Sequence, residues 1–244
     1  MVGSDISWPN CPVGMGVPGR RTLGLPLPAA SARFVIIGIT NGRAFTRNPC
    51  LAMHRQMAVK RGLRTAAYTM LSYPNSAERS RYGKSGPYGD GYLNLIANVG
   101  YAQTAYAIAG MRAAGLPAPF LWVDVEPRAE RGWSKKVQRN RALISGAFRA
   151  ARERGLNVGI YTYAGAWTQI TGNWQLSAPL WAPGHSHAST YARRMSATRA
   201  SCTRVGFTGG PLILTQWVWR NRDYNVTCTR IRTVKTPLWL DYRR

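Results

Sequence analysis

The chain has 244 residues, with 33 Lys and Arg against 9 Asp and Glu, which gives a formal net charge of +24 at pH 7. This charge favours polyanionic partners, namely nucleic acid, anionic lipid or a cell wall rich in teichoic acid. The basic residues are scattered along the sequence, so charge alone does not identify a binding site. A hydrophobic content of 45% without a repeat or low-complexity linker excludes a solenoid and predicts one domain over residues 1–244.

Apolar runs with β-branched and aromatic content predict seven buried strands. They lie at residues 3–8, 34–40, 65–71, 119–126, 158–163, 179–182 and 212–217. Helices are expected at 50–61, 93–114 and 137–154, and residues 72–92 are expected to form a long polar loop. Strands that alternate with helices indicate parallel β/α units. The sequence therefore predicts an α/β fold, an irregular (β/α)8-type, TIM-like barrel in which some helices are short or missing.

Helix 93–114 contains no charge before Arg112, yet its Asn, Gln, Thr, Ala and Gly residues make it a poor membrane span. No transmembrane segment is expected. No signal peptide precedes the first strand, so we expect that an export signal has been removed from a secreted or cell-wall-associated protein.

Four cysteines suit an oxidising compartment, because none of them forms a CxxC pair. Three pairings are possible, and we prefer two bridges that each join neighbouring loops, Cys11–Cys50 and Cys202–Cys228. No set of residues has the spacing of a metal site and no cofactor motif is found, so neither a metal nor a cofactor is expected.

Strand 119–126 carries two acids near its carboxyl end. Asp124 and Glu126 stand at i and i+2, which places both side chains on one face, about 6.6 Å apart. Two buried carboxylates repel each other and are costly unless they are used or neutralised. They are either a pair satisfied by nearby arginines or the acid pair of a glycosidase.

The other acids help to decide between these interpretations. Catalytic residues of β/α barrels lie at the carboxyl ends of the strands, a rule that selects Asp5, Asp124, Glu126 and Asp223, the last a few residues past the final strand. Four of the nine acids thus converge on one end of the expected barrel. Such a cleft suits glycoside hydrolysis, in which one carboxyl protonates the leaving oxygen and another stabilises the cationic sugar.

Several short motifs, in order along the chain, resemble those of glycoside hydrolase family 25, the Chalaropsis-type lysozymes. They are Gly3-Ser4-Asp5-Ile6-Ser7, Ala67-Tyr68, Trp122-Val123-Asp124-Val125-Glu126, Gly159-Ile160-Tyr161-Thr162-Tyr163 with Trp167, Leu180-Trp181-Ala182, and Gln216-Trp217 with Asp223-Tyr224-Asn225. The resemblance covers residues 3–228 and leaves 229–244 as a C-terminal tail. The cysteine-bearing segments, around Cys11 and Cys50, resemble the actinobacterial members of this group more than the classical lysozymes.

This resemblance implies a modified barrel that cleaves the β-1,4 bond between N-acetylmuramic acid and N-acetylglucosamine in peptidoglycan. Glu126 takes the position of the general acid, Asp124 is the partner carboxylate, and Asp5 and Asp223 support the pair. The segment Trp181-Ala182-Pro183-Gly184 lacks the tyrosine that usually follows this strand in the family. This difference bears on which glycan is the substrate more than on the fold.

Aromatic residues near strand ends are candidates for stacking on sugar rings. We select Tyr68, Tyr161, Trp181 and Trp217, and add Asn41 from the turn after strand 34–40 as a further substrate-binding residue. The expected partner of this monomer is peptidoglycan or a related wall glycan, and anionic wall polymers can bind the basic surface.

Two alternatives remain from the sequence. The first is a barrel without catalysis, or with altered specificity, that binds cell-wall polysaccharide. The second is a nucleic-acid-binding protein, which explains the charge but not the acid pair, and no nucleic-acid motif is present.

Overall fold

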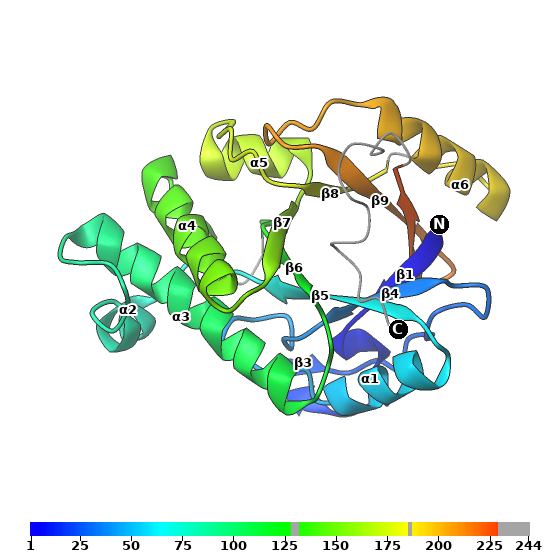
Figure 1. Cartoon of the computed structure of the whole chain (residues 1–244), viewed down its shortest axis with the longest axis horizontal. Coiled ribbons are helices and arrows are strands. Elements are labelled where there is room, and N and C mark those ends of the chain that lie inside the picture. The colour runs from blue at the N-terminus through cyan, green and yellow to red at the C-terminus, as the bar shows by residue number, and fades with distance from the viewer. Residues whose placement is uncertain (128–131, 185–186, 229–244) are drawn as a thin grey trace.

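The computed structural model describes residues 1–127, 132–184 and 187–228, so the expected tail 229–244 lies outside the described residues. The barrel strands are β1 (Val2–Ile6), β4 (Phe34–Gly38), β5 (Arg64–Met70), β6 (Phe120–Asp124), β7 (Asn157–Tyr161), β8 (Leu180–Pro183), β9 (Leu212–Trp219) and β10 (Arg222–Thr227). They close into one barrel in the order β1-β10-β9-β8-β7-β6-β5-β4 (Figure 1). The predicted irregular barrel is confirmed. Strands β2 (Gly16–Val17) and β3 (Arg20–Arg21) form a separate hairpin.

Helices cover the outside of the barrel (Figure 1). They are α1 (Leu51–Lys60), α2 (Ser76–Tyr82), α3 (Tyr92–Ala113), α4 (Val137–Glu153), α5 (Ala164–Thr171) and α6 (Tyr191–Ala200), with 3-10 turns η1 (Trp8–Asn10) and η2 (Ser201–Thr203). Helices α3 and α4 pack closely at Gly146 of α4, where a β-carbon would stand 1.9 Å from the carbonyl oxygen of Ala97 in α3. Within the described residues, no helix has both the length and the apolar composition that a bilayer span requires.

Helix α2 corrects the expectation of a continuous loop over residues 72–92. Asn75 Oδ1 accepts a hydrogen bond from the backbone N–H of Glu78, and the Glu78 carboxylate accepts one from the N–H of Asn75. This reciprocal capping starts, inside the polar segment, a helix that has no buried residue of its own.

Strand β10 is the second correction, because the last strand was expected at 212–217 with Asp223 a few residues past it. A two-residue turn at Arg220 and Asn221, both with positive φ, reverses the chain after β9. Strand β10 then pairs antiparallel with β9 on one side and with β1 on the other. In this register Asp223 lies directly opposite Asp5, so that their side chains share one face of the sheet.

Aromatic rings fill much of the barrel interior. Trp122 and Trp181 are almost fully buried and meet at 5.8 Å between ring centroids, with Tyr68 and Tyr161 packed against the same cluster. Gly38 in β4 allows this packing, because a β-carbon there would stand within 2.7 Å of the Tyr68 ring. The rings form the floor on which the polar residues of the barrel lie.

Both predicted disulfides are present. Cys11–Cys50 joins the first loop to the start of α1, and Cys202–Cys228 joins η2 to the residue after β10. The preferred pairing is therefore confirmed.

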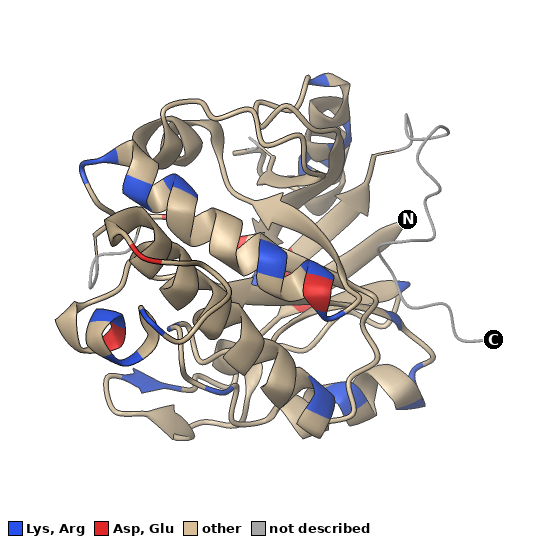
Figure 2. Ribbon diagram, turned by 60° about the vertical axis from the view of Figure 1, so that its left-hand side comes forward, with Lys and Arg blue, Asp and Glu red and all other residues tan. Residues whose placement is uncertain are grey.

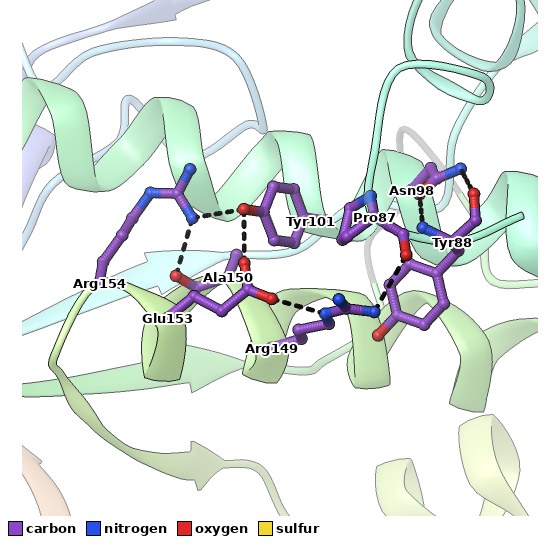
Figure 3. A network of polar contacts seen from close by, with 8 residues as sticks. All are labelled: Pro87, Tyr88, Asn98, Tyr101, Arg149, Ala150, Glu153 and Arg154. Atoms are coloured by element: carbon purple, nitrogen blue, oxygen red, sulfur yellow. Dashed lines mark hydrogen bonds and ion pairs between the residues drawn. The ribbon is translucent and has the colours of Figure 1, made fainter.

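The basic residues are spread over the outer helices and loops (Figure 2). Many guanidinium groups lie over aromatic rings or on backbone carbonyls rather than beside acids. Arg149 makes both of these contacts and, in addition, an ion pair, because it stands over the Tyr88 ring, donates to Pro87 O at 3.1 Å and donates to Glu153 Oε1 at 2.7 Å (Figure 3). Asn98 holds the same loop through hydrogen bonds to both the N–H and the C=O of Tyr88.

Candidate functional site

A cavity of about 360 Å³ opens where the parallel strands of the barrel end. Its lining comprises Asp5, Ser7, Trp8, Pro9, Tyr68, Met70, Asp124, Glu126, Tyr161, Trp181, Gln216, Val218 and Asp223. All four acids selected from the sequence are in this set. Among the described residues that line the cavity there is no Lys or Arg, although the chain contains 33 of them.

The backbone that carries Asp124 and Glu126 is fixed on both sides. Leu71 N–H donates to Asp124 O at 3.1 Å, and Val125 N–H donates to Tyr161 O at 3.0 Å. Trp133 Nε1 donates to Glu126 O at 2.7 Å, just beyond the end of β6. Asp124 is buried, whereas Glu126 is half-buried at the mouth. The alternation predicted for strand 119–126 thus presents both carboxyl groups to one cavity.

Two side-chain amides hold Asp5. Asn225 Nδ2 donates to Asp5 Oδ1 at 2.6 Å, and Gln216 Nε2 donates to the same oxygen at 2.8 Å. An aromatic side chain stands behind each amide. Trp181 Nε1 donates to Asn225 Oδ1 at 2.8 Å. Tyr161 OH donates to Gln216 Oε1 at 2.6 Å.

The two acids that face each other across β1 and β10 have different surroundings. Burial raises the pKa of Asp5 to about 6, although the amide hydrogen bonds act in the opposite direction. Burial raises the pKa of Asp223 to about 8, and the negative charge of Asp5 adds to this shift. No described residue donates a hydrogen bond to the Asp223 carboxyl group. The site therefore contains carboxyl groups in more than one protonation state near neutral pH.

Three of the five predicted substrate-binding residues lie at the cavity: Tyr68, Tyr161 and Trp181. Burial raises the pKa of Tyr161 well above its usual value, with further contributions from Glu126 and the other cavity acids, so its hydroxyl stays protonated and remains a donor. The aromatic rings are packed into the barrel, which leaves mainly their polar edges for a ligand.

Trp217 and Asn41 do not line the cavity, contrary to their selection as substrate-binding residues. Trp217 points from β9 to the outside of the barrel, where it stacks on Tyr224 at 5.2 Å between centroids and packs near Tyr191. Asn41 is fully buried, and its side-chain amide donates to the backbone oxygen of Arg20. In this arrangement neither side chain faces the cavity, and a part in substrate binding stays a prediction for both.

The sequence reasoning missed several cavity residues. Ser7 directly precedes η1, Trp8 and Pro9 belong to it, and Gln216 and Val218 enter from β9. Alternation along strand 212–217 puts Gln216 and Trp217 on opposite faces, but it does not tell which of the two faces the cavity. Nothing in the composition around Trp8 distinguishes it from a core tryptophan.

One cluster has the residue types of a metal site. The sulfurs of Cys11 and Cys50 and a ring nitrogen of His54 lie within 4.8 Å of one another. The two sulfurs are bonded to each other, and the three residues are buried. Burial lowers the pKa of His54 to about 4, which leaves a neutral ring in the core. The cluster does not fit a metal ion, since a disulfide provides no thiolate ligand.

The sequence matches known lysozyme-like proteins over its central part. Residues 91–193 match the family model described as Lysozyme-like protein 1. Lysozyme-like protein 1 of Caenorhabditis elegans is 35% identical over 75 residues, which are 31% of this chain and 24% of that protein. The probable GH family 25 lysozyme 5 of Dictyostelium discoideum is 32% identical over 75 residues, 30% of this chain and 34% of that protein. The matches thus span about a quarter to a third of these relatives.

The fold is similar to that of solved lysozymes over nearly the whole chain. A family GH25 lysozyme from Aspergillus fumigatus superposes with a TM-score of 0.56 at 16% sequence identity, covering 94% of this chain and 95% of that one. At 16% identity this superposition shows similarity of fold alone. The similarity to the lysozyme-like proteins in sequence comes from the matched segments. The resemblance predicted from the ordered motifs is confirmed: in sequence and in fold, this chain resembles the family-25 lysozymes.

Proposed function

We propose that the protein is a glycoside hydrolase of bacterial cell-wall glycan, and that it cleaves the β-1,4 bond between N-acetylmuramic acid and N-acetylglucosamine in peptidoglycan. One observation carries this proposal: four carboxyl groups, those of Asp5, Asp124, Glu126 and Asp223, meet in one cavity at the end of the parallel barrel strands.

Glu126 is the general acid of this proposal. Its side chain stands at the mouth of the cavity, and its backbone is fixed through Trp133. It would protonate the glycosidic oxygen as the bond to the anomeric carbon breaks, and it would then accept a proton from the attacking water.

Asp124 is the partner carboxylate, deeper in the same cavity. The resemblance to family 25 implies a neighbouring-group route, in which the carbonyl oxygen of the substrate acetamido group attacks the anomeric carbon. The leaving oxygen keeps the proton from Glu126, and water later opens the cyclic intermediate. Asp124 would orient the acetamido group and stabilise its positive charge, so neither carboxylate needs to be the nucleophile.

The proposed setting is the cell wall. Two disulfides and a glycan substrate fit a secreted or wall-associated monomer. The basic exterior would add affinity for anionic wall polymers and supply none of the chemistry. Binding to walls with and without teichoic acid, at low and physiological salt, tests this part, and equal binding in all four conditions would contradict it.

Mass spectrometry of the products from purified peptidoglycan tests the reaction. We expect soluble fragments that end in reducing N-acetylmuramic acid, which borohydride converts to the alditol. Fragments ending in reducing N-acetylglucosamine would show that the other glycosidic bond is cut. If the folded protein releases nothing from any wall preparation yet still sediments with walls, it is a binding module instead.

A further inference from the structure

Asp5 and Asp223 are chemically similar acids placed opposite each other at the cavity, but their hydrogen bonding differs. Asp5 Oδ1 accepts two N–H donors, whereas no described residue donates to Asp223. Two N–H donors stabilise the ionised form of a carboxyl group, and a like charge directly opposite favours the neutral form of its neighbour. The geometry alone therefore predicts which of the two ionises first.

Trp181 fixes the orientation of the first amide that donates to Asp5, the side-chain amide of Asn225. An indole N–H can only donate, so the atom that it meets must be the amide oxygen of Asn225. The NH2 group of Asn225 must then point to Asp5. If the indole N–H were lost, the amide would be free to rotate and could present its oxygen to the carboxylate.

Tyr161 fixes the orientation of the second amide that donates to Asp5, the side-chain amide of Gln216. Its hydroxyl donates to Gln216 Oε1, which turns Gln216 Nε2 toward Asp5. The raised pKa of Tyr161 keeps this hydroxyl protonated and able to donate. Because Asp5 Oδ1 accepts hydrogen bonds from both sides, any proton on Asp5 has to reside on Oδ2.

We propose that Trp181 and Tyr161 are positioning residues that act through Asn225 and Gln216 to keep Asp5 ionised, so that Asp223 remains a neutral carboxylic acid and a hydrogen-bond donor to the sugar. The other titratable groups around Asp5 are Asp124 and Glu126 from the end of β6 and Tyr68 from β5. The pKa values, about 6 for Asp5 and about 8 for Asp223, have the same order as the hydrogen bonding.

This inference deepens the proposed function, since it gives the substrate one acceptor and one donor at the β1–β10 edge of the cavity. It also assigns new roles to two residues that the sequence suggested as stacking platforms. Trp181 is almost fully buried, so its indole N–H contributes through Asn225 rather than through a sugar ring.

Carboxyl 13C NMR titration of the unliganded protein tests the order directly. Selective labelling of aspartate, with Asp5→Asn and Asp223→Asn to assign the signals, should show Asp5 titrating below Asp223. In Tyr161→Phe, which removes only the hydroxyl, the Asp5 transition should rise by about one pH unit, and Trp181→Phe should act in the same direction.

Trp217→Phe is the matched control, because it alters an indole on the opposite face of β9 and should leave both transitions in place. An Asp5 transition above that of Asp223, or one that moves in neither aromatic variant, would overturn the inference. Tyr161→Phe decides the question alone if Trp181→Phe does not fold. The titration needs no turnover, so its outcome is separate from that of the peptidoglycan assay.

Discussion

The outer helices and the barrel cavity accommodate charge in different ways. On the outside, arginines far outnumber acids, and their guanidinium groups lie on aromatic rings and carbonyl oxygens, as Arg149 does on Tyr88 and Pro87 (Figure 3). In the cavity, four acids meet without a Lys or Arg among the described lining residues. A cation close to these acids would lower their pKa and offset their negative charge. The comparison shows two arrangements of charge in one strongly basic chain, guanidinium groups spread over exposed rings and carbonyls and four carboxyl groups gathered in one cavity.

The largest effect is expected in the cavity, when the proposed general acid Glu126 is replaced. We expect Glu126→Gln to lower peptidoglycan hydrolysis by at least ~10²–10⁴-fold, because Gln keeps the shape but has no proton to release. Asp124→Asn should also lower peptidoglycan hydrolysis severely. Asp5→Asn should cost less, and Asp223→Asn least, because the raised pKa of Asp223, about 8, favours its neutral form at pH 7.

Product release by each variant, with the thermal transition measured in parallel, checks this order. Wild-type rates in a folded Glu126→Gln protein would show that another group supplies the proton.

A milder change places one cation inside the acidic cavity. Val218 lines the cavity and is 52% exposed, so Val218→Lys should be tolerated by the fold. The ammonium group should lower the pKa of Asp223 by about one unit, and the alkaline limb of the pH–rate profile should move down by a similar amount. Activity near pH 8 should then fall about fivefold, because the protonated fraction of Asp223 drops from about one half to about one tenth.

The control is Val218→Gln, which has similar length without charge and should keep the wild-type profile. If both variants shift the profile equally, the effect comes from sterics rather than electrostatics.

The third prediction concerns stability and pH. The folded pKa of Asp223 lies above that of an unfolded aspartate, so the folded state binds the extra proton and stability falls as pH rises from about 4 toward 8. In Asp223→Asn this contribution is absent, and the slope should decrease by up to about 1.4 kcal/mol per pH unit. Denaturant unfolding at pH 5, 6, 7 and 8 measures it, and parallel curves for the two proteins would contradict the prediction.

The smallest effect is expected on the outer surface. Arg149 and Glu153 form a solvent-exposed ion pair, so Arg149→Gln should move the Tm by no more than about 2 °C and leave the pH–rate profile unchanged. Differential scanning calorimetry checks the first part. A large loss of stability would mean that the contact with Pro87 O holds the loop more firmly than an exposed pair can.

Most of the barrel could be predicted from the sequence, because its parallel strands are apolar runs between Gly and Pro. Strand β10 could not, since Arg222–Thr227 is polar and its hairpin turn uses Arg220 and Asn221 rather than Asn-Gly. Helix α2 was missed for a related reason. Its only local signal is the Asn75 to Glu78 capping pattern in a segment otherwise rich in Gly, Ser and Tyr.

The acids of the site were predictable because carboxyl groups are rare in this chain and fall at strand ends. The side chains around them depend on which face of a strand they occupy. Gln216 and Trp217 are neighbours, and only the register between β8 and β9 turns Gln216 inward and Trp217 outward. The amide donors on Asp5 were equally hidden, because Asn225 belongs to the unrecognised strand β10.

Because β10 pairs with β1, the site is complete only when residues from the two ends of the barrel sequence come together. Asp5 meets Asn225 over 220 residues, and both are required before the pair with Asp223 exists. During synthesis from the amino end, a nascent chain therefore carries Asp124 and Glu126 long before it carries the amides that govern Asp5. A chain interrupted before β9 would contain the proposed acid and lack the hairpin that closes the barrel, so translation must pass the hairpin before the site can work.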